Sequence, residues 1–129
     1  MKTLVVDDDF GCSKLLKQVL SEYGSCDIAS NGILAIELFE KAWQNGDPYN
    51  LLCLDISMPG LNGHQVLRHI RLWEADNEVA NQAKVLMITG FGDPQTIMLS
   101  FKERCEDYLI KPFSITKLIE KICALGLIE

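Results

Sequence analysis

The sequence has few of the features that mark a metal–thiolate, secreted or membrane-spanning protein. Among 129 residues there are five cysteines and two histidines, and no two cysteines form a CxxC pair. An odd, unpaired set gives little support to a zinc site or a redox motif, so we expect reduced thiols and a cytoplasmic location. The longest apolar run is far shorter than the roughly 20 residues that cross a bilayer. The N-terminal residues 1–3 lack the regions of a signal peptide, so we expect no membrane insertion.

Positive charge is also scarce. Twelve Lys and Arg residues stand against eighteen Asp and Glu, which gives a net charge of −6. This sign opposes nonspecific binding to nucleic acid and docking on an anionic membrane. The 48% of hydrophobic residues favours a folded globule, and the length suits one domain over residues 1–129.

Short apolar runs alternate with amphipathic segments, which is typical of βα units around a parallel sheet. Strands are expected at Thr3–Val6, Cys26–Ala29, Leu51–Leu54, Val85–Ile88 and Asp107–Ile110. Helices are expected at Phe10–Tyr23, from a Ser30–Asn31 cap to Trp43, at Gly63–Glu74, at Pro94–Arg104, and from a Ser114 cap to near Gly126. The strands are nearly continuous apolar runs, as expected when helices cover both faces of a sheet. The pattern predicts an α/β fold, a three-layer doubly wound five-stranded parallel sheet.

Helical spacing also predicts which residues face the core. These are Leu15, Leu16, Val19, Leu20 and Tyr23 in the first helix, Ile36, Phe39 and Trp43 in the second, Val66, Ile70 and Trp73 in the third, and Leu118, Ile119 and Ile122 in the last. Gly24 is expected to end the first helix. His64 and His69 lack a metal partner at helical spacing, so surface or helix-packing roles are expected. The polar segment 75–83 is interpreted as a loop or a frayed helix end.

Polar side chains follow four of the expected strands at the point where each strand ends. They are Asp7, Asp8 and Asp9 after the first, Asp55 after the third, Thr89 after the fourth, and Lys111 after the fifth. The carboxyl ends of parallel strands share one edge of the sheet, where ligands bind. Carboxylates, a hydroxyl and an ammonium at one edge are the groups needed to hold a divalent cation and a phosphoryl group together.

Each of these residues also has an ordinary explanation. The aspartates after the first strand suit a solvated turn with one helix cap, Thr89 suits a strand as a β-branched residue, and Lys111 suits an exposed surface. Their joint placement is harder to explain by chance. Adjacent carboxylates resist joint ionisation unless a cation lies among them, and Mg²⁺ is the hard cation that prefers oxygen ligands.

The motifs together resemble the receiver domains of bacterial two-component response regulators. They are Val-Asp-Asp at 6–8, Asp-x-x-Met-Pro-Gly-x-x-Gly at 55–63, Thr-Gly at 89–90 and Asp-Tyr-Leu-Ile-Lys-Pro-Phe at 107–113. The resemblance covers essentially the whole chain. It implies a flavodoxin-like sheet with strand order 2-1-3-4-5.

The resemblance also implies a role for each matching residue. Asp55 is the expected phosphoacceptor, which takes a phosphoryl group from a phosphohistidine on a sensor histidine kinase or a histidine phosphotransfer protein. Asp7, Asp8, Asp55 and the backbone carbonyl of Ser57 are the expected Mg²⁺ ligands. Thr89 and Tyr108 are the expected switch residues, and Lys111 is the expected phosphoryl contact. The output is expected to be a downstream target protein that binds the face of the fourth helix, fifth strand and fifth helix. No enzymatic action on an external substrate is implied.

Two positions vary within the family and tune the lifetime of the phosphoryl group. They are Ser57, two residues after the acceptor, and Phe91, two residues after Thr89. Phe91 has no polar group to orient water, so slow unassisted dephosphorylation is the hypothesis. The 75–83 segment is longer than in compact family members.

Several alternatives remain open at this point. A dehalogenase-like phosphatase would need an Asp-x-Asp pair, but Ser57 stands two residues after Asp55. A flavodoxin-like mononucleotide binder would need a phosphate loop where this chain has aspartates. A pseudo-receiver that binds partners without phosphorylation is a further alternative. The chain ends soon after the last expected helix, which favours a stand-alone domain over a piece of a longer regulator. Chemotaxis-type control is plausible by analogy with single-domain family members.

Overall fold

A computed structural model of the chain describes residues 1–90 and 94–129. Five parallel strands occur in the described part, at β1 (Thr3–Val6), β2 (Cys26–Ala29), β3 (Leu51–Asp55), β4 (Lys84–Thr89) and β5 (Asp107–Ile110). The described helices are α1 (Phe10–Leu20), the 3₁₀ turn η1 (Ser21–Tyr23), α2 (Gly32–Gln44), α3 (Gly63–Asp76), α4 (Pro94–Lys102) and α5 (Ile115–Ala124). The strand order is β2-β1-β3-β4-β5, the flavodoxin-like order implied by the resemblance.

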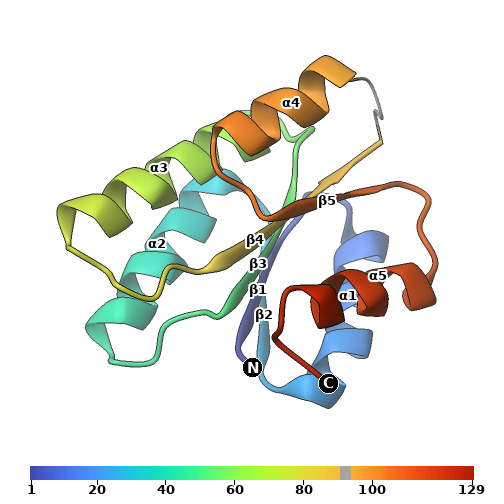
Figure 1. Ribbon diagram of the computed structural model, residues 1–129, viewed down its shortest axis with the longest axis horizontal. Helices are drawn as coiled ribbons and strands as arrows, with labels where there is room; N and C mark the ends of the chain where they lie inside the picture. Colours follow the sequence, from blue (N-terminus) through green and yellow to red (C-terminus); the bar gives the residue numbers. More distant parts are fainter. Residues whose placement is uncertain (91–93) are drawn as a thin grey trace.

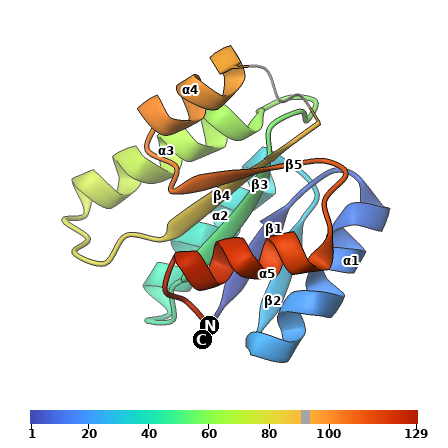
Figure 2. The same ribbon diagram turned by 45° about the vertical axis from the view of Figure 1, so that its right-hand side comes forward.

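The sheet lies between two layers of helices, with α2, α3 and α4 on one side and α1 and α5 on the other (Figure 1 and Figure 2). Each layer closes its own hydrophobic core. Phe39, Leu67 and Ile70 pack on one face of the sheet, and Leu16 and Ile122 pack on the other. Because both faces are covered, β1 and β3 are buried along their whole length, as their continuous apolar sequences predicted.

Polar caps fix where the helices begin, and therefore where the loops at the carboxyl edge of the sheet turn back. Asp9 accepts hydrogen bonds from the backbone N–H groups of Gly11 and Cys12 at the start of α1. Asn62 and Gln65 form a reciprocal capping box at the start of α3, which satisfies backbone donors that the helix leaves unpaired. Gly24 ends η1 with a φ of +147°, and a Cβ there would lie 1.7 Å from the carbonyl oxygen of Met1. Only glycine fits at that position.

The expected elements are all present, with shifted ends. β3 and β4 extend beyond the expected ranges, α3 runs on to Asp76, and α1 stops at Leu20, where a 3₁₀ turn replaces its last expected residues. α4 ends at Lys102 instead of Arg104. The inward placement of Leu15 was wrong, since this side chain is 41% exposed. The apolar stripe on α1 is wider than the face of the helix that is buried. Leu15 lies at the exposed margin of this stripe.

The expectations for the histidines and tryptophans agree with the structure. His64 is buried against α4 and His69 is exposed. Trp43 and Trp73 are partly buried and pack against the core, with ring centroids 6.2 Å apart. None of the described helices has the length and apolarity needed to span a membrane.

Candidate functional site

Three aspartates come together at the carboxyl edge of the sheet, the upper edge in Figure 1. β1 and β3 are paired in register, with Val6 opposite Leu54, so the residues that follow these two are neighbours. One carboxylate oxygen from each of Asp7, Asp8 and Asp55 lies within 4.8 Å of the others. Asp7 and Asp55 are buried, whereas Asp8 is exposed. The predicted acidic pocket is therefore assembled by the strand register.

Lys111 reaches the same pocket from the far side of β4. Its Nζ lies 3.2 Å from Oδ2 of Asp7 and 3.8 Å from Oδ1 of Asp55. The backbone N–H of Lys111 donates to the carbonyl oxygen of Thr89, which ties the loop after β5 to the end of β4. The Lys111–Pro112 peptide bond is cis. The ammonium is thus held beside both buried carboxylates.

The groups in the pocket shift one another's pKa values. Burial raises the pKa of Asp55 to about 7, and the neighbouring Asp7 carboxylate adds to this rise while Lys111 opposes it. Burial would lower the pKa of Lys111, but Asp55 and Asp7 outweigh it and hold this pKa above its ordinary value. Two carboxylates therefore compete for a single ammonium.

The donor set suits a hard divalent cation. It consists of carboxylate oxygens, without a thiolate or imidazole among the clustered ligand atoms. Three carboxylates exceed the single positive charge of Lys111, and the Asp7 carboxylate adds to the rise that burial gives the pKa of Asp55. A divalent cation would relieve the repulsion. On this chemistry the residues fit Mg²⁺.

The turn after β3 is built tightly around Asp55. The backbone N–H of Ser57 donates to Oδ1 of Asp55, and that of Gly63 donates to the carbonyl oxygen of Ile56. A Cβ on Gly63 would lie 2.5 Å from the carbonyl oxygen of Asp55 and 2.9 Å from the Cα of Ile56. Gly63 therefore lets α3 begin directly against the backbone that carries Asp55.

The two expected switch residues lie on neighbouring strands. Thr89 is fully buried at the end of β4. Tyr108 lies in β5 opposite Met87, and it is half-buried with its ring edge-on to Phe101 at 5.9 Å between centroids. The expectation for Phe91 lies outside the described residues.

The structure also contains one site residue, Cys12, that the sequence did not single out. Cys12 lies beside the acidic pocket, where burial raises the pKa of its thiol to about 12 and a hydrogen bond to Asp7 adds to this rise. Asp9 caps α1 and donates its backbone N–H to Oδ1 of Asp7. The Asp7–Asp8–Asp9 triplet thus divides into pocket residues and a cap. Spacing alone could not show which aspartate does which.

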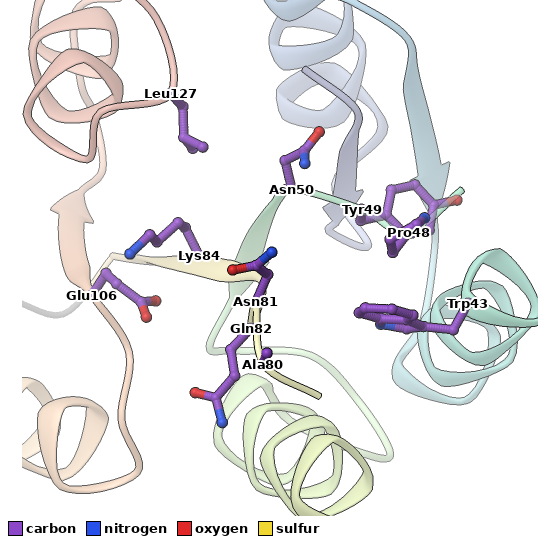
Figure 3. A pocket seen from close by; sticks show the side chains of 10 residues that line it. All are labelled: Trp43, Pro48, Tyr49, Asn50, Ala80, Asn81, Gln82, Lys84, Glu106 and Leu127. Carbon is purple, nitrogen blue, oxygen red and sulfur yellow. The ribbon is translucent and has the colours of Figure 1, made fainter. Parts of the chain in front are cut away.

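A hollow of about 670 Å³ lies at the opposite edge of the sheet, between the loop before β3 and the loop before β4. Figure 3 shows Lys84 and Glu106 at one side of this hollow and Trp43 at the other. The acidic cluster takes no part in its lining. The residues expected to bind the cation and the phosphoryl group therefore lie at the carboxyl edge and not in this hollow.

Comparison with known proteins identifies the family. Residues 3–123 match the response regulator receiver domain, and the chain belongs to this family. Chemotaxis protein CheY1 of Helicobacter pylori is 33% identical over 124 residues, which cover 95% of this chain and 94% of CheY1. Regulatory protein VanRB of Enterococcus faecalis is 31% identical over 122 residues, which cover 95% of this chain and 50% of VanRB. The chain thus spans about half the length of several curated relatives that it matches.

Solved structures share the fold. A two-component response regulator of Clostridium difficile superposes with a TM-score of 0.81 at 27% identity, over 98% of this chain and 95% of that one. The CheX–CheY complex of Borrelia burgdorferi with BeF₃ and Mg gives a TM-score of 0.84 at 23% identity, over 98% of this chain and 89% of that one. These likenesses establish the five-stranded receiver architecture for this chain.

Proposed function

We propose that the chain is a phosphoryl-accepting switch, with Asp55 as the acceptor. The observation that carries this proposal is the buried Asp55 carboxylate, held at the edge of the sheet between Asp7 and the Lys111 ammonium. A receiver domain is a signalling phosphoacceptor by family. The whole of residues 1–129 acts as one such domain, and it works in the cytoplasm without direct contact to nucleic acid.

The donor is a phosphohistidine on a sensor histidine kinase or a histidine phosphotransfer protein. An Asp55 carboxylate oxygen attacks phosphorus, the phosphorus–nitrogen bond breaks, and its electron pair stays on the imidazole nitrogen. Lys111 balances charge on the transferred oxygens as a fixed point charge. Asp7, Asp8, Asp55 and the backbone carbonyl of Ser57 hold Mg²⁺, which supplies further positive charge for the phosphoryl group.

The acyl phosphate then acts on the fold through its new charge. The Thr89 hydroxyl moves to hydrogen-bond a phosphoryl oxygen, and Tyr108 turns inward, which alters the face of α4, β5 and α5. This is a two-state switch biased by a local charge. A downstream target protein reads this face, and Met98, Phe101 and Ile110 already expose apolar surface there.

The test is intact mass after incubation with Mg²⁺ and acetyl phosphate, on the native protein and on Asp55→Asn. One added phosphoryl group, dependent on Mg²⁺ and absent from the variant, is the expected result. Asp27→Asn, which changes an exposed aspartate in β2, should keep the adduct. A folded native protein without an adduct would overturn the proposal and favour a pseudo-receiver that binds partners without phosphorylation.

A further inference from the structure

α3 presents a polar stripe to α4. His64, Arg68 and Arg71 stand at i, i+4 and i+7, which places them on one side of a helix. Nε2 of His64 lies 2.9 Å from Oγ of Ser100, and Arg68 forms an ion pair with Glu103 at 3.1 Å. Arg71 contacts the segment just beyond α4. The stripe therefore follows α4 toward its C-terminal end.

Apolar contacts hold α4 only weakly. Of its described residues, Ser100 is the one that is fully buried, while Met98 and Phe101 are 70% and 44% exposed. Most helices on a sheet are fixed by an apolar stripe. Polar contacts from α3 therefore supplement the apolar ones, such as the ring contact of Phe101 with Tyr108, in positioning α4.

Arg71 is the strongest part of this connection. It is 2% exposed, and each of its five N–H donors has an acceptor. Nε and Nη2 donate to the carbonyl oxygen of Arg104, Nη1 donates to Glu74 and to the carbonyl oxygen of Ala83, and Nη2 also donates to both carboxylate oxygens of Glu106. A buried guanidinium satisfied in this way is costly to displace.

The partners of Arg71 are themselves fixed. Arg104 has a φ of +70° just after α4, where the backbone N–H of Cys105 donates to the carbonyl oxygen of Ser100, an ending that closes a helix. Oε2 of Glu106 also accepts from the backbone N–H of Val85, and Oε2 of Glu74 accepts from that of Ala83. One network thus joins α3, the start of β4, the end of α4 and the start of β5.

We propose that Arg71, Glu74 and Glu106 form a fixed pivot at the C-terminal end of α4, so that phosphorylation of Asp55 swings α4 about Arg104 instead of shifting the helix as a whole. This inference rests on the proposed function. The phosphoryl site lies at the carboxyl edge of the sheet, and the pivot lies at the opposite edge. Motion that begins at the carboxyl edge therefore decreases along α4 and β5 toward the pivot.

Glu106 offers the sharpest variant. It is the member of the network that reaches the hollow at the far edge of the sheet (Figure 3), and its side chain is 26% exposed, so Glu106→Gln keeps the shape without burying a new charge. A carboxamide has one acceptor oxygen and no negative charge, so Glu106→Gln removes at least one of the hydrogen bonds that Glu106 accepts from Arg71 and Val85, together with the ion pair to Arg71. Glu103→Gln is the matched control, because it weakens the ion pair to Arg68, which is 61% exposed, and leaves the contacts of Arg71 in place.

The experiment maps backbone amide chemical shifts with and without Mg²⁺ and acetyl phosphate, with intact mass as a measure of phosphorylation. In the native protein, shifts should change on phosphorylation over residues 94–99 and 108–111 and stay nearly constant over 103–106. In Glu106→Gln the changes should spread through 103–106, and hydrogen exchange at the amides of Arg104 and Cys105 should quicken about tenfold or more. Glu103→Gln should behave like the native protein.

Two results would overturn the pivot alone while the phosphoryl adduct still forms. One is a native shift change over residues 103–106 as large as that over 94–99. The other is an equal response of Glu106→Gln and Glu103→Gln. The first needs no variant, so poor folding of Glu106→Gln cannot obscure it. A native protein that gains no phosphoryl mass would instead overturn the proposed function, and the pivot with it.

Discussion

The Asp55 carboxylate lies between opposing influences, since it is buried beside the carboxylate of Asp7 and the ammonium of Lys111. Burial and Asp7 raise its pKa to about 7, and Lys111 opposes this rise. The charge of the proposed phosphoacceptor therefore depends on its immediate neighbours. Single substitutions around it should therefore affect phosphorylation far more than they affect the fold.

Lys111→Met should slow formation of the phosphoryl adduct on the order of 10²-fold, because it removes the fixed ammonium that balances charge on the transferred oxygens. Intact mass as a function of time measures this rate. Lys121→Met is the control, since Lys121 is similarly exposed but pairs with Asp107 away from the acidic pocket. Equal rates in the two variants would remove Lys111 from the phosphoryl site.

Gly63→Ala should lower the free energy of unfolding by about 1–3 kcal/mol, the usual cost of overpacking. The added Cβ would press on the backbone of Asp55 and Ile56, so adduct formation should also slow. Urea unfolding and intact mass measure the two effects. Gly11→Ala is the control in the first turn of α1, where the Cβ meets only Oδ1 of Asp9 at 3.4 Å, and no loss is expected there.

Among the helices, α3 has two structural roles. Its N-terminus supports the turn that carries Asp55, and its polar stripe positions α4. The stripe includes a buried histidine, which makes the contact between the helices sensitive to acid. The groups that face this imidazole are the Ser100 hydroxyl, the backbone of Thr96 and the charged side chains of Glu103 and Arg68.

Burial lowers the pKa of His64 below its ordinary value of 6.5. Since the unfolded chain then takes up a proton more readily than the folded one, stability is retained above pH 6.5 and lost as the pH falls toward the folded value. Replacing the imidazole by His64→Gln removes this loss. As the pH falls from about 7.5 to 5.5, the native protein should lose more stability than the variant, by no more than about 1.4 kcal/mol, as measured by urea unfolding at each pH.

His69→Gln provides the comparison on the same helix, because His69 is exposed. It should lose stability with acid in parallel with the native protein. If both histidine variants follow the native curve, the buried imidazole is not the group that titrates.

The local sequence predicted the helices and strands, but it did not predict the side-chain contacts between the helices. The strands were found because continuous apolar runs, closed by Asp55 or Thr89, require burial on both faces. The carboxyl-edge site followed from topology, since parallel strands bring Asp7 and Lys111 to one edge although 104 positions separate them. The stripe of α3 could not be predicted, because Arg71 alternates with apolar residues like any surface arginine. Two of its acceptors, Arg104 and Glu106, lie more than 30 residues away.

Over the whole molecule, the two edges of the sheet carry different charge balances. At the carboxyl edge, the carboxylates of Asp7, Asp8 and Asp55 exceed the single ammonium of Lys111. At the opposite edge, Arg71 is enclosed between the carboxylates of Glu74 and Glu106. The carboxyl edge can therefore bind a cation. At the opposite edge, the charged groups already form ion pairs with one another. The proposed switch, which moves at one edge and is fixed at the other, would use this asymmetry.

The charge excess predicts that Mg²⁺ stabilises the folded chain as a whole. A ligand that binds only the folded state raises the free energy of unfolding by about 2.7 kcal/mol at a hundredfold excess over its Kd. Thermal unfolding with and without Mg²⁺ measures this effect, and Asp8→Asn should greatly reduce it by removing the exposed carboxylate of the cluster. Asp47→Asn, which changes an exposed aspartate paired with Lys2, should respond to Mg²⁺ like the native protein. Stabilisation that is equal in both variants would mean that the cation acts through general screening of the net charge of −6, because a bound ion must distinguish the carboxylates that hold it from those that do not.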